Sequence, residues 1–203
     1  MKVVKLGDIC SFSRGLTYKK SDEVNFSKNI VLRANNIDLS SNSLLLDDLR
    51  YIKDSIKIDA EKLVKKNSLI ICTASGSKSH LGKVALITED FGYSFGGFMG
   101  QITPSKECHH RFLFYILTSP NFKDFLMSLT DGTNINNLKF IDIEDYEIKL
   151  PKYDEQVKIV DKLDKAFAEI DSLEKNLKLK EERISTLRQS ILSNAFNFVE
   201  KTT

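Results

Sequence analysis

The sequence has no tryptophan, only three prolines and three cysteines, and no long apolar run. Its apolar stretches all fall short of the roughly 18 residues that a membrane-spanning helix needs, and the start at residues 1–8 leads into no apolar segment. We therefore expect neither a signal peptide nor a membrane anchor, and a cytoplasmic location. Cys10, Cys72 and Cys108 are odd in number and far apart, which argues against a disulfide framework and favours reduced thiols.

Catalytic motifs are absent or incomplete. The segment GSKSHLGK at residues 76–83 resembles a phosphate-binding loop, but it has one residue too many between its glycines, and Val84 stands where the magnesium-binding hydroxyl should be. Glu147 and Lys149 match the end of a D/E-x-K nuclease motif without a suitable upstream acidic ligand. Neither a dinucleotide-binding glycine motif nor a G-x-S-x-G nucleophile motif occurs. Since the Cys-His-His cluster at residues 108–110 also lacks paired cysteines, we expect no catalytic residue, no cofactor and no metal site.

What the chain does contain is a set of basic loops on a nearly neutral protein, whose formal net charge is +2. Between residues 11 and 20 the charged side chains are Arg14, Lys19 and Lys20, and between residues 73 and 83 they are Lys78 and Lys83. Local basic loops of this kind fit a specific binding surface, although solvated loop lysines are the commoner explanation.

The first three quarters of the chain predict many short strands around two or three helices. Residues 30–32 and 69–72 are strand-like, and each strand continues into a polar loop. Residues 140–150 predict a last pair of strands. Helices are predicted from apolar spacing at residues 60–66, 110–117 and 122–129. The mixture predicts an α+β (mixed α/β) domain. Aromatic residues at helical spacing fit either base stacking or the core, and the spacing favours the core: Phe112, Phe114, Tyr115, Phe122 and Phe125.

A long helix follows this domain. Pro151 ends the last strand, and the carboxylates of Asp154 and Glu155 suit the N-terminus of a helix. At about 1.5 Å per residue, residues 154–196 would form a rod on the order of 60 Å long. Its apolar residues recur in heptads and define a seam: Ile159, Leu163, Ala166, Ile170, Leu173, Leu177, Ile184, Leu187 and Ile191.

The seam is too long for one small domain to cover, so it predicts pairing with a second copy of the chain, although an ordinary amphipathic helix would fold back on its own domain. An antiparallel coiled coil gives one good register: Leu163 with Leu187, Leu173 with Leu177, Ile184 with Ala166, and Ile191 with Ile159. Lys180 opposite Ile170 is the one poor pairing in it. We accordingly divide the chain into a domain at residues 1–150 and a dimerisation helix with a short tail at residues 151–203.

The segment INNLKFIDIEDYEIKLPKYDEQVKIVDKL, at residues 135–163, resembles the junction between a target-recognition domain and the long spacer helix in DNA specificity (S, HsdS) subunits of type I restriction-modification systems. Other segments resemble this family in the same order: VKLGDICSFSRG, VLRANNID, SGSKSHLGKVALI, SFGGFMGQITP and RQSILSNAF. The chain departs from longer relatives at FNFV, which stands in place of a glycine-containing tail.

The resemblance implies a recognition subunit without catalysis of its own. Family members usually hold two recognition domains and two antiparallel helices, whereas this sequence has one of each, so the resemblance implies a half-length form that dimerises. Such a dimer would read a bipartite inverted repeat in double-stranded DNA. It would dock methyltransferase (M) subunits and, through them, restriction (R) subunits.

DNA contacts are expected from polar and basic side chains in loops, where Arg, Asn and Ser can read base edges and Lys can hold phosphates. The expected contacts are Arg14, Lys19, Lys20, Arg33, Asn35, Asn36, Thr73, Ser75, Ser77, Lys78, Ser79, His80, Asn134, Asn136 and Asn137. A structural ion pair at Arg33 and simple turn capping by the asparagines after residue 133 are the competing interpretations.

Two other functions stay open: a stand-alone dimeric DNA-binding regulator, and a small Mg²⁺-dependent nuclease built on Glu147 and Lys149.

Overall fold

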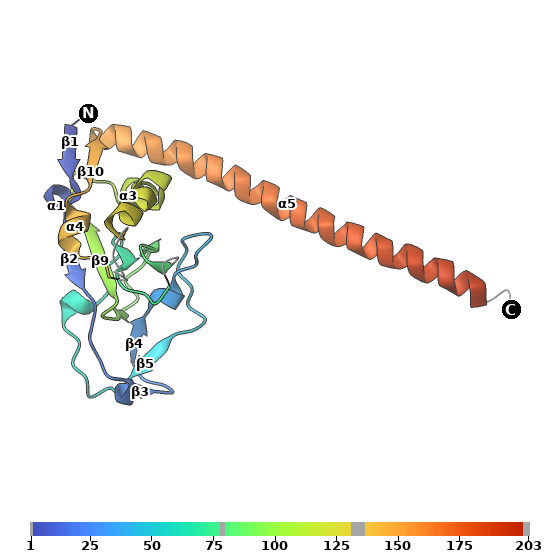
Figure 1. The fold of residues 1–203 in the computed structure, drawn as a ribbon, viewed down its shortest axis with the longest axis horizontal. Helices are drawn as coiled ribbons and strands as arrows, with labels where there is room; N and C mark the ends of the chain where they lie inside the picture. The colour runs from blue at the N-terminus through green and yellow to red at the C-terminus, as the bar shows by residue number, and fades with distance from the viewer. Residues whose placement is uncertain (1, 78–79, 131–136, 201–203) are drawn as a thin grey trace. The chain divides into compact units, whose positions relative to one another are not determined.

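The computed structural model describes residues 2–77, 80–130 and 137–200. The chain forms two compact units, Met1–Val157 and Lys158–Thr203 (Figure 1). The first unit contains all of the strands in the described residues, and the second consists of the greater part of one long helix. In the described residues, no helix is both long and apolar enough to span a membrane.

Three sheets build the first unit. A two-stranded sheet pairs β1 (Lys2–Lys5) antiparallel with β10 (Glu147–Leu150). A four-stranded sheet has the order β2 (Cys10–Arg14), β9 (Met99–Pro104), β6 (Leu69–Cys72) and β7 (Val84–Leu86). A second four-stranded sheet has the order β3 (Glu23–Val24), β5 (Arg50–Ile52), β4 (Asn29–Leu32) and β8 (Ser94–Phe95). Only the pairing of β4 with β8 is parallel among these strands.

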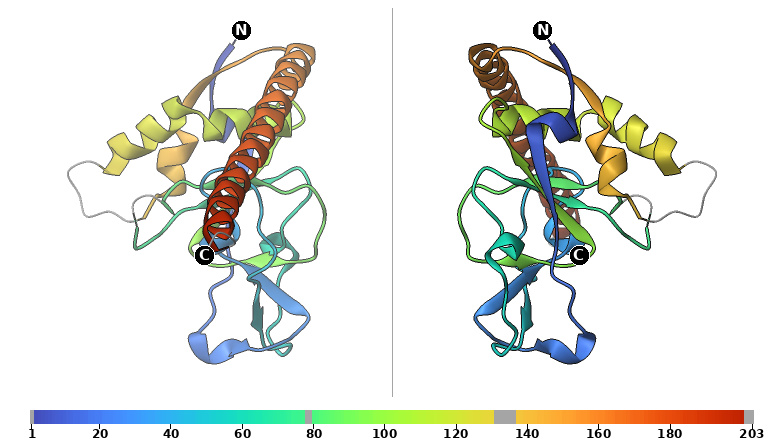
Figure 2. Two further views of the ribbon diagram at one scale, coloured as in Figure 1. Left: turned by 90° about the vertical axis from the view of Figure 1, so that its right-hand side faces the viewer. Right: turned by 90° about the vertical axis from the view of Figure 1, so that its left-hand side faces the viewer.

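Short helices connect the strands, and the mixed α+β class expected from the sequence is confirmed. The α-helices are α1 (Leu6–Ile9), α2 (His110–Thr118), α3 (Pro120–Thr130), α4 (Phe140–Glu144) and α5 (Tyr153–Glu200). Among the described residues, 3₁₀ turns include η1 (Lys20–Asp22), η2 (Ala34–Asn36) and η3 (Ala60–Lys62). Within the first unit, β1, β10 and α3 lie toward one end and β3 and β5 lie at the other (Figures 1 and 2).

The core lies where the two four-stranded sheets meet. Its buried cluster includes Leu32 from β4, Ile70 and Cys72 from β6, Phe95 from β8 and Met99 from β9. The continuous apolar run of β6 is buried at all four positions, as its sequence suggests. Of the aromatic residues on α2 and α3, Phe112 and Phe122 are buried, so their assignment to the core is confirmed.

Two local predictions are wrong. Residues 140–144 form the helix α4 instead of a strand, because Phe140 and Ile143 share one helical face: the Phe140 ring packs 5.6 Å from the Phe12 ring, and Ile143 is fully buried. The helix expected at residues 60–66 is only the turn η3, because Val64 instead donates its backbone N–H to the carbonyl of Tyr93, which ties this segment to the sheet.

A buried glutamine fixes the beginning of α5. The Gln156 side chain is 0% exposed. Its Oε1 accepts the backbone N–H of His109 at 2.8 Å, and its Nε2 donates to the carbonyls of Glu107 at 2.8 Å and Pro151 at 3.0 Å. The first turn is also capped, since the Lys152 N–H donates to the Glu155 carboxylate at 3.2 Å. The buried amide thus extends the first unit to Val157, past the proline that ends β10.

Replacing Gln156 with Met should destabilise the first unit by about 2–4 kcal/mol, because Met keeps the volume but leaves one backbone N–H and two carbonyls without their buried partner. The free energy of unfolding in urea measures the effect. Lys158→Met is the matched control, since Lys158 is exposed two positions further along the same helix, and it should change stability by less than about 0.5 kcal/mol. Equal stability of the two variants would contradict this role of Gln156.

Candidate nucleic-acid interface

A pocket of about 570 Å³ opens on the first unit where four loop segments meet. Its lining comes from residues 16–23, 33–35, 74–76 and 96–99. Each of these segments adjoins the end of a short strand, so the sheets set their positions. The pocket thus brings together loops that the sequence separates by up to 80 residues.

Backbone hydrogen bonds connect the four segments. The N–H of Leu16 donates to the Phe95 carbonyl at 2.6 Å, and the N–H of Gly96 donates to the Leu32 carbonyl at 2.8 Å. The Phe98 carbonyl accepts the N–H groups of Thr73 at 2.9 Å and Ala74 at 3.2 Å. These bonds leave the loops little freedom to separate, because breaking one would leave a partly buried backbone group without a partner.

Glycine makes one of these approaches possible. A Cβ atom at Gly15 would collide with the carbonyl oxygens of Phe95 and Gly96. Any larger residue at this position would therefore push the 15–18 segment away from the turn that follows β8.

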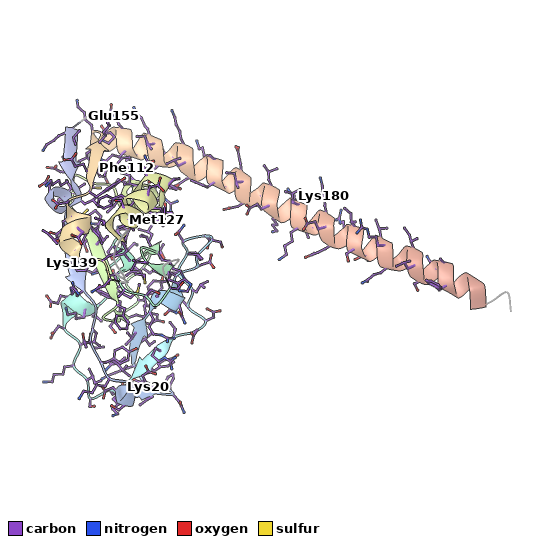
Figure 3. The ribbon with its side chains drawn as sticks, in the orientation of Figure 1. Lys20, Phe112, Met127, Lys139, Glu155 and Lys180 are labelled. Carbon is purple, nitrogen blue, oxygen red and sulfur yellow. The ribbon has the colours of Figure 1, made fainter. Side chains whose placement is uncertain are left out.

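Four of the expected DNA contacts line the pocket: Lys20, Arg33, Asn35 and Ser75. Lys20 and Asn35 are exposed. Lys20 lies at the end of the unit that carries β3 (Figure 3). Tyr18 adds a phenol to the same lining, and burial, reinforced by the nearby Glu23 carboxylate, raises its pKa above the ordinary value. The phenol therefore keeps its proton at neutral pH and can donate a hydrogen bond.

Arg33 forms the ion pair that the sequence allows, and it also lines the pocket. Its guanidinium forms an ion pair with Asp48 at 3.1 Å, and the Arg33 side chain is 26% exposed while that of Asp48 is 65% exposed. Its buried Nε has no hydrogen-bond partner among the described residues. A pair this open to water contributes little to stability, about 0–1 kcal/mol, so the guanidinium can exchange Asp48 for another acceptor at low cost.

Asn36 and Thr73, two further expected contacts, lie inside the protein. Asn36 is 0% exposed; its Oδ1 accepts the Arg33 N–H at 2.8 Å, and its Nδ2 donates to the carbonyls of Leu45 and Asp48, both at 3.0 Å. Thr73 is 4% exposed and its Oγ1 donates to the Phe98 carbonyl at 3.0 Å. Neither side chain is free to touch a base in this conformation, and both instead hold pocket loops in place.

The remaining expected contacts lie on or near the same loops. Arg14 ends β2 and its guanidinium carbon lies 5.3 Å from the centre of the Phe140 ring, a cation–π distance. Asn137 forms a β-bridge with Ala74, which connects the segment before α4 to the loop after β6. Lys19 and Ser77 are also in loops, and His80 is in a 3₁₀ turn. Four expected contacts lie outside the described residues: Lys78, Ser79, Asn134 and Asn136.

Phe98 lines the pocket but is absent from the contacts that the sequence predicts. Its side chain is 74% exposed. The available signal is its place in SFGGFMG, where two glycines precede an aromatic residue at a strand boundary. That signal is weak because it does not distinguish Phe98 from Phe95, which is buried in the same segment.

The polar groups of the pocket lining are mainly hydrogen-bond donors and cations, and few of them are groups of the kind used in catalysis. In the part of the chain that the structure describes, no three His, Cys, Asp or Glu side chains are grouped so that they could hold a metal ion. Glu147 and Lys149 are exposed and alternate with the buried Ile148 and Leu150 along β10, the ordinary pattern of a half-buried strand. The arrangement suits an acceptor-rich ligand such as phosphate groups or base edges.

A comparison with protein families matches residues 1–182 to the type I restriction modification DNA specificity domain. The chain belongs to this family. It is 32% identical over 201 residues to the EcoKI specificity subunit of Escherichia coli (strain K12), with 96% of this chain and 42% of that protein covered. It is also 32% identical over 193 residues to the StySPI specificity subunit of Salmonella potsdam, with 92% and 40% covered. The resemblance seen in the sequence is confirmed. The match to specificity subunits also supports the expectation that this chain has no catalytic role.

Solved structures of the same class share the fold. One chain from a study of complex assembly and conformational transition of the type I R-M system superposes with a TM-score of 0.74 at 18% identity, covering 96% of this chain and 45% of that one. The HsdS subunit from Thermoanaerobacter tengcongensis superposes with a TM-score of 0.64 at 15% identity, covering 86% and 39%. The chain spans about two fifths of the length of the curated specificity subunits that it matches.

The neighbouring residues Asn35 and Asn36 should respond oppositely to mutation. Asn36→Ala removes three buried hydrogen bonds and should lower the free energy of unfolding by about 2–3 kcal/mol. Asn35→Ala changes an exposed side chain and should lower it by less than about 0.5 kcal/mol. Urea unfolding of both variants measures the difference, and a large loss for Asn35→Ala would contradict this description of the loop.

Proposed function

We propose that the chain is the sequence-specific DNA-binding subunit of a type I restriction-modification enzyme and works as a homodimer. Residues 1–150 are the target-recognition domain and residues 151–203 are the spacer helix. The observation that carries this proposal is the family match over residues 1–182, which includes both the pocket-bearing unit and most of the helix. Methyltransferase subunits that dock on this chain supply the chemistry, and restriction subunits join through them.

The pocket loops are the proposed DNA-reading surface. Lys19 and Lys20 are exposed and suit phosphate contacts, which position a protein without reading sequence. Arg33 and Asn35 line the pocket itself, and their side chains are those that pair with guanine O6/N7 and adenine N6/N7 in the major groove. Asn36 and Thr73 support this surface through their buried hydrogen bonds and are no longer proposed as base contacts.

The apolar seam of α5 is the proposed dimer interface. Leu173, Leu177 and Leu187 are 63%, 59% and 61% exposed, and Ile184 and Ile191 are 50% and 65% exposed. So many large apolar side chains along one helical face are costly to leave in water, at roughly 25 cal/mol per Å². An identical helix in the antiparallel register supplies a matching seam of the same length.

A twofold dimer of this kind presents two identical recognition domains, so its target is an inverted repeat with a fixed spacing between the halves. The helix pair sets that spacing, and each domain reads one half-site. A stand-alone dimeric regulator would use the same loops and the same helix, but its DNA affinity would not depend on methyltransferase subunits.

The dimer should dissociate when charged residues replace leucines of the seam. Light scattering of the intact chain should give twice the 23.1 kDa chain mass, and Leu173→Asp with Leu177→Asp should give the single-chain mass. The matched control is Leu179→Asp with Leu192→Asp, which changes two exposed leucines of the same helix outside the seam and should leave the dimer intact. A single-chain mass for the intact protein would contradict the homodimer and assign the seam to another protein's helix.

DNA binding should depend on salt through Lys20. Lys20→Ala should weaken binding about equally for all sequences and reduce the slope of log affinity against log salt by about 1 per half-site, since one phosphate contact is lost. Titration of duplex DNA, with and without methyltransferase subunits, measures this. The control is Lys2→Ala, because β1 lies at the other end of the unit from Lys20 (Figures 1 and 3). Tight binding by the chain alone, unchanged by methyltransferase, would favour the regulator.

A further inference from the structure

Phe98 is a large apolar side chain held outward beside charged and polar groups. It is 74% exposed, while its sequence neighbours Phe95 and Met99 are 0% and 1% exposed. A single exposed aromatic residue is common and needs no special explanation. Phe98 differs from such a residue because it lines the pocket that also contains Lys20, Arg33 and Asn35.

The backbone at Phe98 is fixed on both sides. Its carbonyl accepts three hydrogen bonds, from the N–H groups of Thr73 and Ala74 and from the Thr73 hydroxyl. The N–H of the following Met99 donates to the Gly96 carbonyl at 2.8 Å and closes the turn. These bonds fix the backbone from which the ring projects, and the ring lies in water in this structure. The ring therefore stands ready for an apolar partner without a further ordering cost for its backbone.

The choice of partner follows from the chemistry of the major groove. Base edges in that groove present hydrogen-bond donors and acceptors and a single kind of apolar group, the C5 methyl of thymine. We propose that Phe98 is a specificity-determining residue that contacts a thymine methyl group within each half-site. This inference rests on the proposed function, because it needs the pocket loops to face the major groove.

The neighbouring side chains fit this role. Arg33 and Asn35 read purine edges by hydrogen bonds, and neither can favour thymine through its methyl group. An exposed Phe next to them adds the missing apolar contact, so a pocket with these residues can distinguish thymine from cytosine at one position. The adjacent Lys20 holds the phosphate backbone and keeps the register of the base contacts.

The test begins with selection from a randomised duplex DNA library, using the full chain together with methyltransferase subunits. The enriched half-site should contain at least one thymine. Replacing that thymidine with deoxyuridine removes only the methyl group and should weaken binding about fourfold per half-site, the value expected for one buried methyl. Phe98→Ala should lose a similar factor on the thymine duplex and show no further loss on the uracil duplex.

Phe26→Ala is the matched control. Phe26 is 83% exposed in the same unit, lies 5.5 Å from the Tyr51 ring and is not part of the pocket lining. This variant should retain the full difference between thymine and uracil. Unchanged unfolding of Phe98→Ala in urea verifies that its fold is intact, as expected for an exposed side chain.

The outcomes separate this inference from the function on which it rests. An enriched site without thymine, or a Phe98→Ala variant that still distinguishes thymine from uracil, overturns the role of Phe98 and leaves the proposed function standing. An intact complex that enriches no sequence overturns the proposed function, and the role of Phe98 fails with it. Loss of the thymine preference in Phe98→Ala alone supports the inference.

Discussion

Backbone hydrogen bonds between four segments that are distant in sequence hold the candidate interface together. The Phe98 carbonyl is central to them, because it accepts the N–H groups that begin the loop after β6, and the bonds from Leu16 and Gly96 secure the turn after β8 on either side. Everything proposed for DNA reading depends on this frame, which holds the pocket loops together and fixes the backbone at Phe98. Because the frame uses main-chain atoms, the side chains on it are available for recognition.

Ion pairs contribute less than these backbone hydrogen bonds to holding the candidate interface together, and they act locally. The ion pair between Arg33 and Asp48 is partly exposed, so its contribution to stability is small and the guanidinium stays available. Buried polar side chains, by contrast, contribute to stability and are not available to a ligand, because their polar atoms bond to backbone groups. These side chains are Asn36, Gln156 and Thr73. The residues that stabilise the loops thus differ from those proposed for recognition, even where they are neighbours in the chain.

Elements whose structure is determined by the pattern of their own residues could be predicted from the sequence. The continuous apolar run of β6 and the long heptad pattern of α5 each specify their own structure, and the family resemblance rests on continuous segments of the chain. Asn35 and Asn36 could not be distinguished, because their different burial depends on Leu45 and Asp48, which lie about ten residues further along. Residues 140–144 were ambiguous for a similar reason: only contact with Phe12 decides between strand and helix. Phe98 could not be found because its exposure is a property of the frame and not of its own surroundings in the chain.

Gln156 has a consequence for how such a chain can change over generations. All three of its hydrogen bonds go to main-chain atoms, of Glu107, His109 and Pro151. A main-chain partner is present whatever side chain occupies the position, so these bonds do not depend on which side chains residues 107 and 109 carry. The loops proposed to read DNA lie elsewhere in the unit, so changes in them need not disturb these bonds at the beginning of the helix. One buried amide would thus be enough to hold the junction while the loops proposed to read DNA change.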